Sequence, residues 1–218
     1  MAAFRPQLEQ LPEEFAVFPL GGALLLPGGR LPLNIFEPRY LAMTEDALAG
    51  GRLLGMIQPD PGLPEGPSGP GLFRVGCLGR ITSFSETEDG RFLVTLTGVA
   101  RFAVLEELEM RRGYRRLRVR CEDPAAPPAP AFIPREKLLG ALKAYFARRG
   151  LGANWEAISR LPDQTLLTTV SMACPFSPAE KQALLEAPGE AERAEALLAL
   201  LQMGGLLPDE DGPGRMPS

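Results

Sequence analysis

Side chains that could catalyse a reaction are scarce in this 218-residue sequence, which contains no histidine. Mechanisms that need an imidazole, such as a Ser-His-Asp triad, a Cys-His pair or a histidine-bound zinc, are therefore excluded. Cys77, Cys121 and Cys174 are too far apart for a metal knuckle or a Cys-x-x-Cys redox pair. An odd number of unpaired cysteines is typical of a reducing compartment, so we expect buried thiols, no metal and a cytoplasmic protein.

A Ser-Lys dyad needs no histidine, and the nearest such pair is Ser177 and Lys181. Ser177 is followed by Pro178 and, three residues on, by Glu180, which predicts a capping box that commits its hydroxyl to backbone amides. We expect Lys181 to lie on a solvated helix face. The sequence has no P-loop and no dinucleotide-binding glycine motif, so we expect no cofactor and no enzymatic activity.

Three segments rich in proline and glycine divide the chain. We expect residues 59–70 to form a mobile loop, residues 122–133 a hinge and residues 204–218 a flexible tail. The hinge separates a β-rich subdomain, residues 1–121, from a helical subdomain, residues 134–203. No basic segment precedes an apolar run as in an export signal, and no run approaches the roughly 20 residues that span a bilayer.

The pattern before the hinge predicts six or seven short strands, mostly connected as a meander, that close into a small barrel or coiled sheet. One helix is expected within them, beginning at Pro38 and ending at Gly50, with Phe36 and Leu41 as a hydrophobic staple. After the hinge, apolar stripes and caps at Asn154, Asp163 and Ser177 predict a bundle of four or five helices. The expected fold class is α+β.

Two surface patterns could bind a partner. The first is a strand with six arginines around Tyr114, which either contacts RNA or protects a sheet edge with charge; the arginines are Arg111, Arg112, Arg115, Arg116, Arg118 and Arg120. Glu106, Glu107 and Glu109 could neutralise this strand across a hairpin. With a net charge of −4, nucleic acid and membrane surfaces are unfavoured partners.

The second pattern is the apolar, proline-punctuated stretch over residues 17–40, which is loop-like in its middle. Its large side chains either fill a core or line an apolar groove for a partner. The candidate polypeptide-binding residues are Leu24, Leu25, Leu26, Pro27, Leu31, Leu33, Ile35 and Phe36.

This stretch resembles the N-terminal, substrate-binding domain of Lon protease. The matching motifs are Phe18-Pro19-Leu20, Leu26-Pro27-Gly28, the run from Leu31 to Tyr40, Gly76 to Ile81, and Leu96 to Phe102. The resemblance covers residues 14–203 and implies a PUA-like β pseudobarrel followed by a helical bundle. The motif residues for which we expect a structural role are Pro19, Leu20, Glu37, Pro38, Arg39, Tyr40, Gly79, Gly98 and Arg101.

The resemblance also implies a non-catalytic role in recognising unfolded polypeptides, because the ATPase and peptidase activities of Lon belong to later domains. We therefore expect a detached recognition module that binds exposed apolar segments of unfolded or partner polypeptides, with a Lon-type or other protease as a further candidate partner and weak self-association as an option. An RNA-binding module using the Arg111–Arg120 strand is the alternative, and an enzyme with a small-molecule cleft is a third. The arginine-rich, lysine-poor composition suggests a bacterial source.

Overall fold

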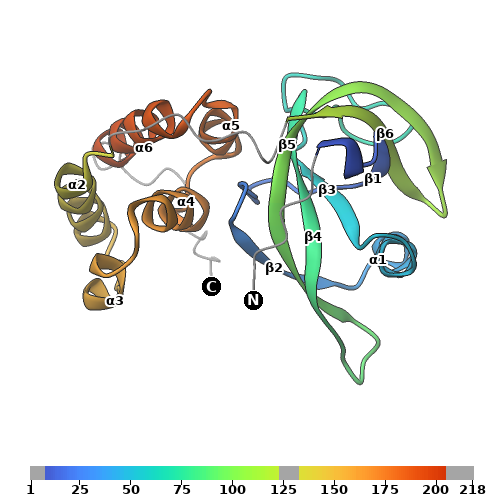
Figure 1. Cartoon of the computed structure of the whole chain (residues 1–218), viewed down its shortest axis with the longest axis horizontal. Coiled ribbons are helices and arrows are strands. Elements are labelled where there is room, and N and C mark those ends of the chain that lie inside the picture. Colours follow the sequence, from blue (N-terminus) through green and yellow to red (C-terminus); the bar gives the residue numbers. More distant parts are fainter. Residues whose placement is uncertain (1–7, 123–132, 205–218) are drawn as a thin grey trace, which may run out of the picture.

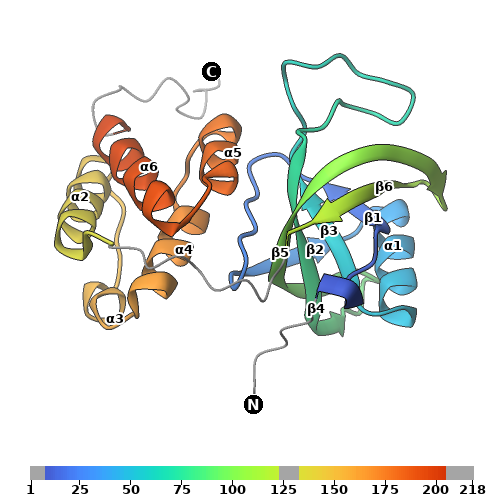
Figure 2. The ribbon, with the colours of Figure 1, turned by 45° about the horizontal axis from the view of Figure 1, so that its top comes forward.

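The computed structural model describes residues 8–122 and 133–204, in which a β half and a helical half lie side by side (Figures 1 and 2). After a short 3₁₀ turn at Leu8–Gln10, the β half contains β1 (Glu14–Pro19), β2 (Arg30–Ile35), α1 (Pro38–Ala49), β3 (Leu53–Ile57), β4 (Val75–Glu86), β5 (Phe92–Arg111) and β6 (Tyr114–Cys121). The helical half contains α2 (Arg135–Arg148), α3 (Trp155–Ser159), α4 (Asp163–Ala173), α5 (Pro178–Glu186) and α6 (Glu190–Met203). The α+β expectation is confirmed.

The strands follow the order β2-β5-β4-β3-β1-β6, and a further pairing of β5 with β6 closes five of them into a barrel. The expected meander connects β3, β4, β5 and β6, but β1 and β2 depart from it. β1 pairs in parallel with β3, with Val17 opposite Gly55, and β2 pairs with β5. β2 and α1 form the crossover between β1 and β3, as a parallel pair requires a long connection.

Two long strands replace several expected short ones. β5 runs through Gly98 and Arg101 without a turn, and β4 continues through Gly79. Gly98 instead allows a close backbone approach, because a Cβ atom there would lie 2.0 Å from the carbonyl oxygen of Leu26. Glycine inside a strand marks either a bend or such an approach, and sequence alone does not separate the two.

The barrel interior is apolar, with Phe15, Val17, Leu78, Phe102 and Leu117 among its buried side chains. The Phe102 ring fits into the barrel because the residue against it is Gly76. A Cβ atom at position 76 would lie 2.3 Å from the ring carbon Cζ of Phe102. α1 covers the outside of the sheet with a stripe of Tyr40, Met43 and Ala47, all buried. A second and larger apolar core extends from α1 through the loop before β2 into the helical half.

Polar side chains join the two halves through α5. The Gln58 amide at the end of β3 donates to the side-chain oxygen of Gln182 at 3.2 Å and to the carbonyl oxygen of Pro178 at 3.0 Å. Gln182 in turn donates to the carbonyl oxygen of Val75 at 3.0 Å. Because both amide groups are buried, these bonds specify how α5 sits on the barrel.

The predicted hinge and tail lie almost wholly outside the described residues. Residues 59–70, expected as a mobile loop, form turns with a bridge between Gly66 and Gly69, and the Arg115 guanidinium donates to the carbonyl oxygen of Pro70 at 2.6 Å. Within the described ranges, no helix is long and apolar enough to cross a membrane.

Candidate functional site

Most of the candidate polypeptide-binding residues are in the core, which corrects the sequence interpretation. The buried ones are Leu24, Leu25, Leu26, Leu33 and Ile35, each no more than 8% exposed. The loop before β2 is enclosed between the barrel, α1 and the helical half, so its leucines contribute to the shared core. A stretch without regular periodicity can still be buried when elements far away in sequence cover it.

Phe36, Leu31 and Pro27 retain accessible surface. Phe36 is 61% exposed, so the predicted staple between Phe36 and Leu41 is wrong. The backbone alternation explains this exposure, because Leu33 and Ile35 face the core and the residues between and beyond them face outward.

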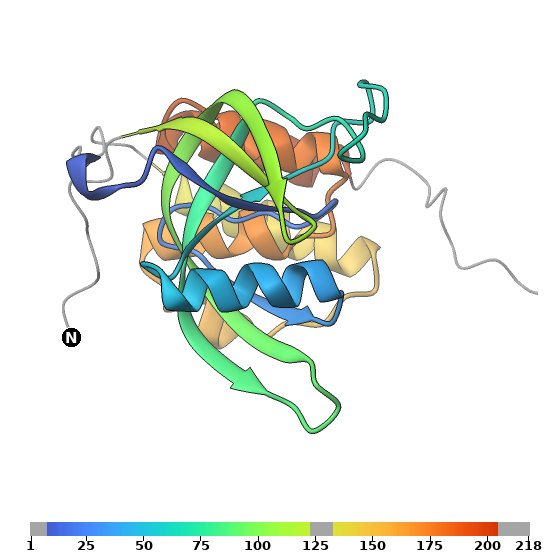
Figure 3. The same ribbon diagram turned by 90° about the vertical axis from the view of Figure 1, so that its right-hand side faces the viewer.

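The hairpin between β4 and β5 projects beyond the barrel in Figures 1 and 3. Residues 82–86 of β4 and 92–97 of β5, together with β2, which pairs with β5, form a three-stranded unit that we call the arm. Its core face packs toward α1 through Phe92 and Val94. Its opposite face carries Pro32, Phe36, Arg91 and Leu93, which we call the arm patch.

The arm patch lies beside an open depression of about 470 Å³. Residues of β2, β4 and β5 line this depression, half of them apolar and half small and polar: Pro32, Leu33, Asn34, Ser83, Ser85, Leu93, Val94 and Thr95. Leu93 is 45% exposed, and the Arg91 guanidinium lies 5.9 Å from the centre of the Phe36 ring. A shallow apolar surface with a polar margin can contact a side chain of a partner.

Sequence reasoning missed Leu93 and Arg91. A signal was present, because Leu93 interrupts the outward, polar side of an alternating strand that continues with Thr95 and Thr97. A large apolar residue on the polar face of an amphipathic strand is the kind of exposure that marks a contact surface.

The hairpin turn beside the patch is held by polar contacts. Arg91 and Asp89 form an ion pair at 2.8 Å, and Thr87 hydrogen-bonds to the Asp89 carboxylate. The Thr87 hydroxyl and the charge of Arg91 lower the pKa of Asp89. The turn therefore holds Arg91 in place beside Phe36.

The family-motif residues have structural surroundings. Arg101 donates from its guanidinium to the carbonyl oxygens of Leu185 and Ala187 at the end of α5 and forms an ion pair with Glu122 at 2.7 Å. Gly79 gives space to Leu25, because a Cβ atom at Gly79 would lie 2.8 Å from the leucine methyl carbon Cδ2.

Four of the motif residues, Glu37 to Tyr40, build the start of α1. Pro38 occupies its first turn, and Arg39 forms an ion pair with Glu37 at 2.8 Å. The Tyr40 ring packs on Phe18, with 4.2 Å between the ring centres. In these contacts the motif residues form the start of α1 and pack α1 on β1.

Ser177 and Lys181 do not form a dyad. The predicted capping box is present, with the Ser177 hydroxyl accepting from the N–H of Glu180 at 3.3 Å and the Glu180 carboxylate accepting from the N–H of Ser177 at 2.7 Å. The expectation of a solvated Lys181 is wrong, because the side chain is buried and donates to the carbonyl oxygen of Gly22 at 2.5 Å. Burial lowers the pKa of Lys181.

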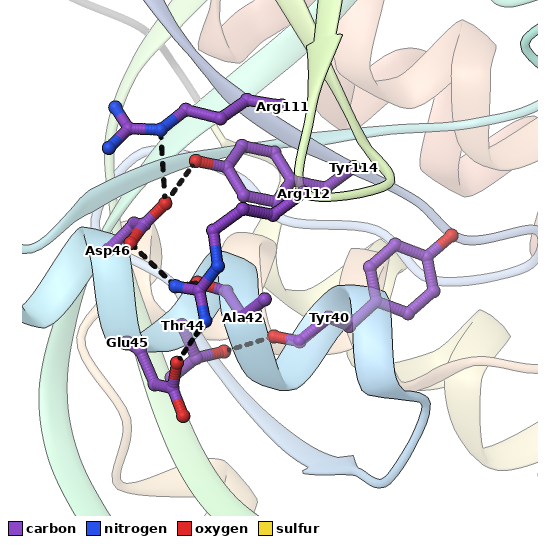
Figure 4. A network of polar contacts seen from close by, with 8 residues as sticks. All are labelled: Tyr40, Ala42, Thr44, Glu45, Asp46, Arg111, Arg112 and Tyr114. Atoms are coloured by element: carbon purple, nitrogen blue, oxygen red, sulfur yellow. Dashed lines mark hydrogen bonds and ion pairs between the residues drawn. The ribbon is translucent and has the colours of Figure 1, made fainter.

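Five of the six arginines in the basic strand have carboxylate partners. The ion pairs are Arg111 with Asp46, Arg112 with Glu45 and Asp46, Arg115 with Glu107, Arg116 with Glu14, and Arg118 with Glu14 and Glu106. Figure 4 shows Asp46 on α1 receiving Arg111, Arg112 and the Tyr114 hydroxyl. This neutralisation, predicted for Glu106 and Glu107, disfavours RNA binding. The edge-protecting interpretation is wrong, because β6 pairs with β1 on one side and with β5 on the other and is not an edge strand.

A family model described as the ATP-dependent protease La (LON) substrate-binding domain matches residues 14–203. The chain therefore belongs to the Lon substrate-binding domain family.

Lon protease 2 of Thermus thermophilus is 29% identical over 200 residues, covering 88% of this chain and 24% of that protein. Lon protease of Anaeromyxobacter dehalogenans is 28% identical over 98 residues, covering 45% of this chain and 12% of that protein. The chain thus spans a quarter or less of the length of these relatives.

Two solved structures share the fold. The N-terminal domain of the Mycobacterium avium complex Lon protease superposes with a TM-score of 0.62 at 20% identity, covering 86% of this chain and 97% of that one. The Lon N-terminal domain protein from Xanthomonas campestris superposes with a TM-score of 0.56 at 24% identity, covering 85% and 97% respectively.

Proposed function

We propose that this protein recognises exposed apolar segments of unfolded or partner polypeptides without chemical change, and that the arm patch is the binding surface. The observation that carries the proposal is the joint exposure of Phe36 and Leu93, which the strand register places on one face of the arm. Membership of a substrate-binding domain family supports a recognition role. The relatives named above are Lon proteases, so a protease is the partner class that we propose, in a bacterial cytoplasm.

The size of the patch predicts weak binding. Burying a side chain of the size of Phe36 or Leu93 gains about 1.5–3 kcal/mol, and association and ordering remove much of that gain. A dissociation constant of roughly micromolar or weaker follows. Such a module acts through several weak contacts at once, either along one long chain or beside a protease that already holds the same polypeptide.

The test is binding of fluorescein-labelled casein, measured by anisotropy. Exchange of Phe36→Ser together with Leu93→Ser is expected to weaken binding about tenfold or more, because both apolar contacts are lost. The matched control is Leu105→Ser with Met110→Ser, which removes two side chains that are 54% and 46% exposed outside the arm. Equal losses in the two double variants would show that the arm patch is not the binding surface.

We also propose that residues 1–121 and 134–203 act as two subdomains joined through residues 122–133. The order of the elements along the chain supports this division, because the strands all precede residue 122 and α2 to α6 all follow residue 134. The contacts of α5 with Gln58, Arg101 and Gly22 are polar bonds that would keep the two halves associated. Limited proteolysis within 122–133, followed by gel filtration, would show whether the two fragments stay associated.

A further inference from the structure

Barrel closure pairs both sides of most strands, but free edges remain at the arm and along β5 beyond residue 104, where the described residues place a partner strand on the β6 side only. β4 pairs with β3 only over residues 77–80, and from residue 82 onward its side away from β5 has no strand beside it in the described structure. β2 likewise pairs with β5 alone. The arm therefore has two free edges, one along β2 and one along the end of β4.

The hydrogen-bond pattern tells which backbone groups point outward on β4. Glu86 lies opposite Phe92, while the N–H of Thr87 donates to the carbonyl oxygen of Arg91 at 2.9 Å. Thr87 and Arg91 are the next pair along the two strands and are hydrogen-bonded, so Glu86 and Phe92 are a non-hydrogen-bonded pair. In such a pair the backbone N–H and C=O groups of each residue point away from the other strand. By alternation, Phe84 and Glu86 present their backbone N–H and C=O groups to the free edge.

The two edges differ in protection. On β2 the N–H of Gly98 donates to the carbonyl oxygen of Gly29, which makes Arg30 and Thr97 a non-hydrogen-bonded pair and turns Pro32 and Asn34 outward. Pro32 lacks an N–H and interrupts this edge in its middle, a common device against strand addition. Residues 82–86 contain no proline and no lysine, so the β4 edge lacks such a block.

Side chains beside the β4 edge indicate what kind of strand would fit. Phe84 is 40% exposed and packs edge-on against Phe92, with 5.0 Å between the ring centres. An added strand would place an apolar side chain beside the Phe84 ring. Glu86 and Glu88 are exposed and have no ion pair within the described residues, so a basic side chain would be complementary there.

We propose that the free edge of β4 at Phe84–Glu86 binds an extended polypeptide segment as an additional strand, and that the preferred segment carries an apolar and a basic residue two positions apart, on the face that Phe84 and Glu86 share. This inference rests on the proposed function and specifies its mode, in which backbone hydrogen bonds supply affinity and alternate side chains supply preference. The arm patch then contacts parts of the polypeptide beyond the added strand.

The first test uses a fluorescein-labelled eight-residue peptide in which phenylalanine and lysine alternate along one face of the strand, with threonine at every intervening position. Only alternate N–H groups of an added strand face the edge. N-methylation of one alternate set is expected to weaken binding about tenfold, and methylation of the other set to leave it within about twofold. Equal effects of the two sets would overturn strand addition.

The second test changes the protein. Glu86→Pro removes an outward N–H that β5 does not use, whereas Glu86→Ala keeps this N–H and removes only the charge. We expect binding of the same peptide to be about five- to tenfold weaker in the proline variant than in the alanine variant, with unchanged thermal stability. Equal binding by the two variants overturns the edge proposal, while a lower stability of the proline variant overturns the assignment of an outward N–H.

The two proposals fail in distinguishable ways. If the unmodified peptide binds and the methylated peptides and Glu86 variants all bind equally well, the edge mode is wrong and polypeptide recognition stands. If neither casein nor the unmodified peptide binds at high micromolar concentration, both proposals are wrong.

Discussion

The Arg101 guanidinium on β5 lies within hydrogen-bonding distance of the Leu185 carbonyl oxygen at the end of α5, with 3.0 Å between nitrogen and oxygen. The same side chain also donates to the carbonyl oxygens of Ala187 and Pro188. One arginine thus satisfies several carbonyl groups where α5 ends and fixes that end against the barrel.

We therefore expect Arg101→Ala to lower the free energy of unfolding by about 2–3 kcal/mol, because carbonyl groups are left without donors. Arg101→Lys should recover only part of this loss, since an ammonium group cannot reach the same carbonyls with a planar fork. Urea unfolding followed by circular dichroism measures both. Arg91→Ala, at a half-exposed position, is the control. A loss no larger than in that control would contradict the role of Arg101 in joining the halves.

Gly98 is predicted to tolerate no side chain. Gly98→Ala would place a Cβ atom 2.0 Å from the Leu26 carbonyl oxygen, which is backbone and cannot move without displacing the buried loop. We expect a loss of about 3 kcal/mol or more. Gly140→Ala in α2 is the comparison, because no atom lies within 4 Å of the added methyl group there, and a gain of about 0.5–1 kcal/mol is expected. Thermal melting of both variants gives the result.

Asp46 links α1 to the β5–β6 hairpin in a pH-dependent way. The hydrogen bond from Tyr114, with further contributions from Arg112 and Arg111, lowers the pKa of Asp46 below its ordinary value of 3.8. Burial and the contact with Asp46 raise the pKa of Tyr114 to about 12, so the phenol stays protonated as the donor. Because the folded pKa of Asp46 is depressed, its stabilising contribution is complete above the ordinary value and is lost as the pH falls through the lowered pKa.

We expect Asp46→Asn to reduce stability by about 1 kcal/mol at pH 7, with the difference from the parent protein shrinking at acidic pH. Urea unfolding at pH 7 and near pH 3 measures this difference. Glu65→Gln, at an exposed position of the 59–70 loop, provides a control. A difference that stays constant over this range would argue against a charged Asp46 as the source of the effect.

The three thiols are expected to react slowly while the protein is folded. Burial raises the pKa of Cys77 and Cys174 to about 12 and that of Cys121 to about 11, so little thiolate forms near neutral pH. Cys121 is the least buried of the three and should be labelled first by a disulfide reagent at pH 8. Mass spectrometry of the labelled peptides gives the order, and rapid labelling of Cys77 before Cys121 would contradict the barrel packing.

Local chemistry in the sequence was sufficient for the helix starts and for several buried faces. Pro38 and the Ser177 box mark helix beginnings, and the stripe of Tyr40, Met43 and Ala47 gives the buried side of α1. The expected cap at Asp163 is absent. Asp163 is the first residue of α4, Pro162 occupies the N-cap position, and no side chain caps this helix end. Short-range signals are reliable where the partners lie within one turn of each other.

Three further features also followed from sequence. The separation of β-rich and helical segments depends on composition, the family on the order of its motifs, and the neutralised arginine strand on the pairing of a hairpin. Tertiary structure alone decided that Leu24 to Leu26 and Lys181 are buried and that Phe36 is exposed. Each of these depends on which distant element covers one side of a segment, and the periodicity of a segment carries no information about that cover. The free edge of β4 has the same origin, because it exists only where barrel closure ends and leaves the arm beyond it.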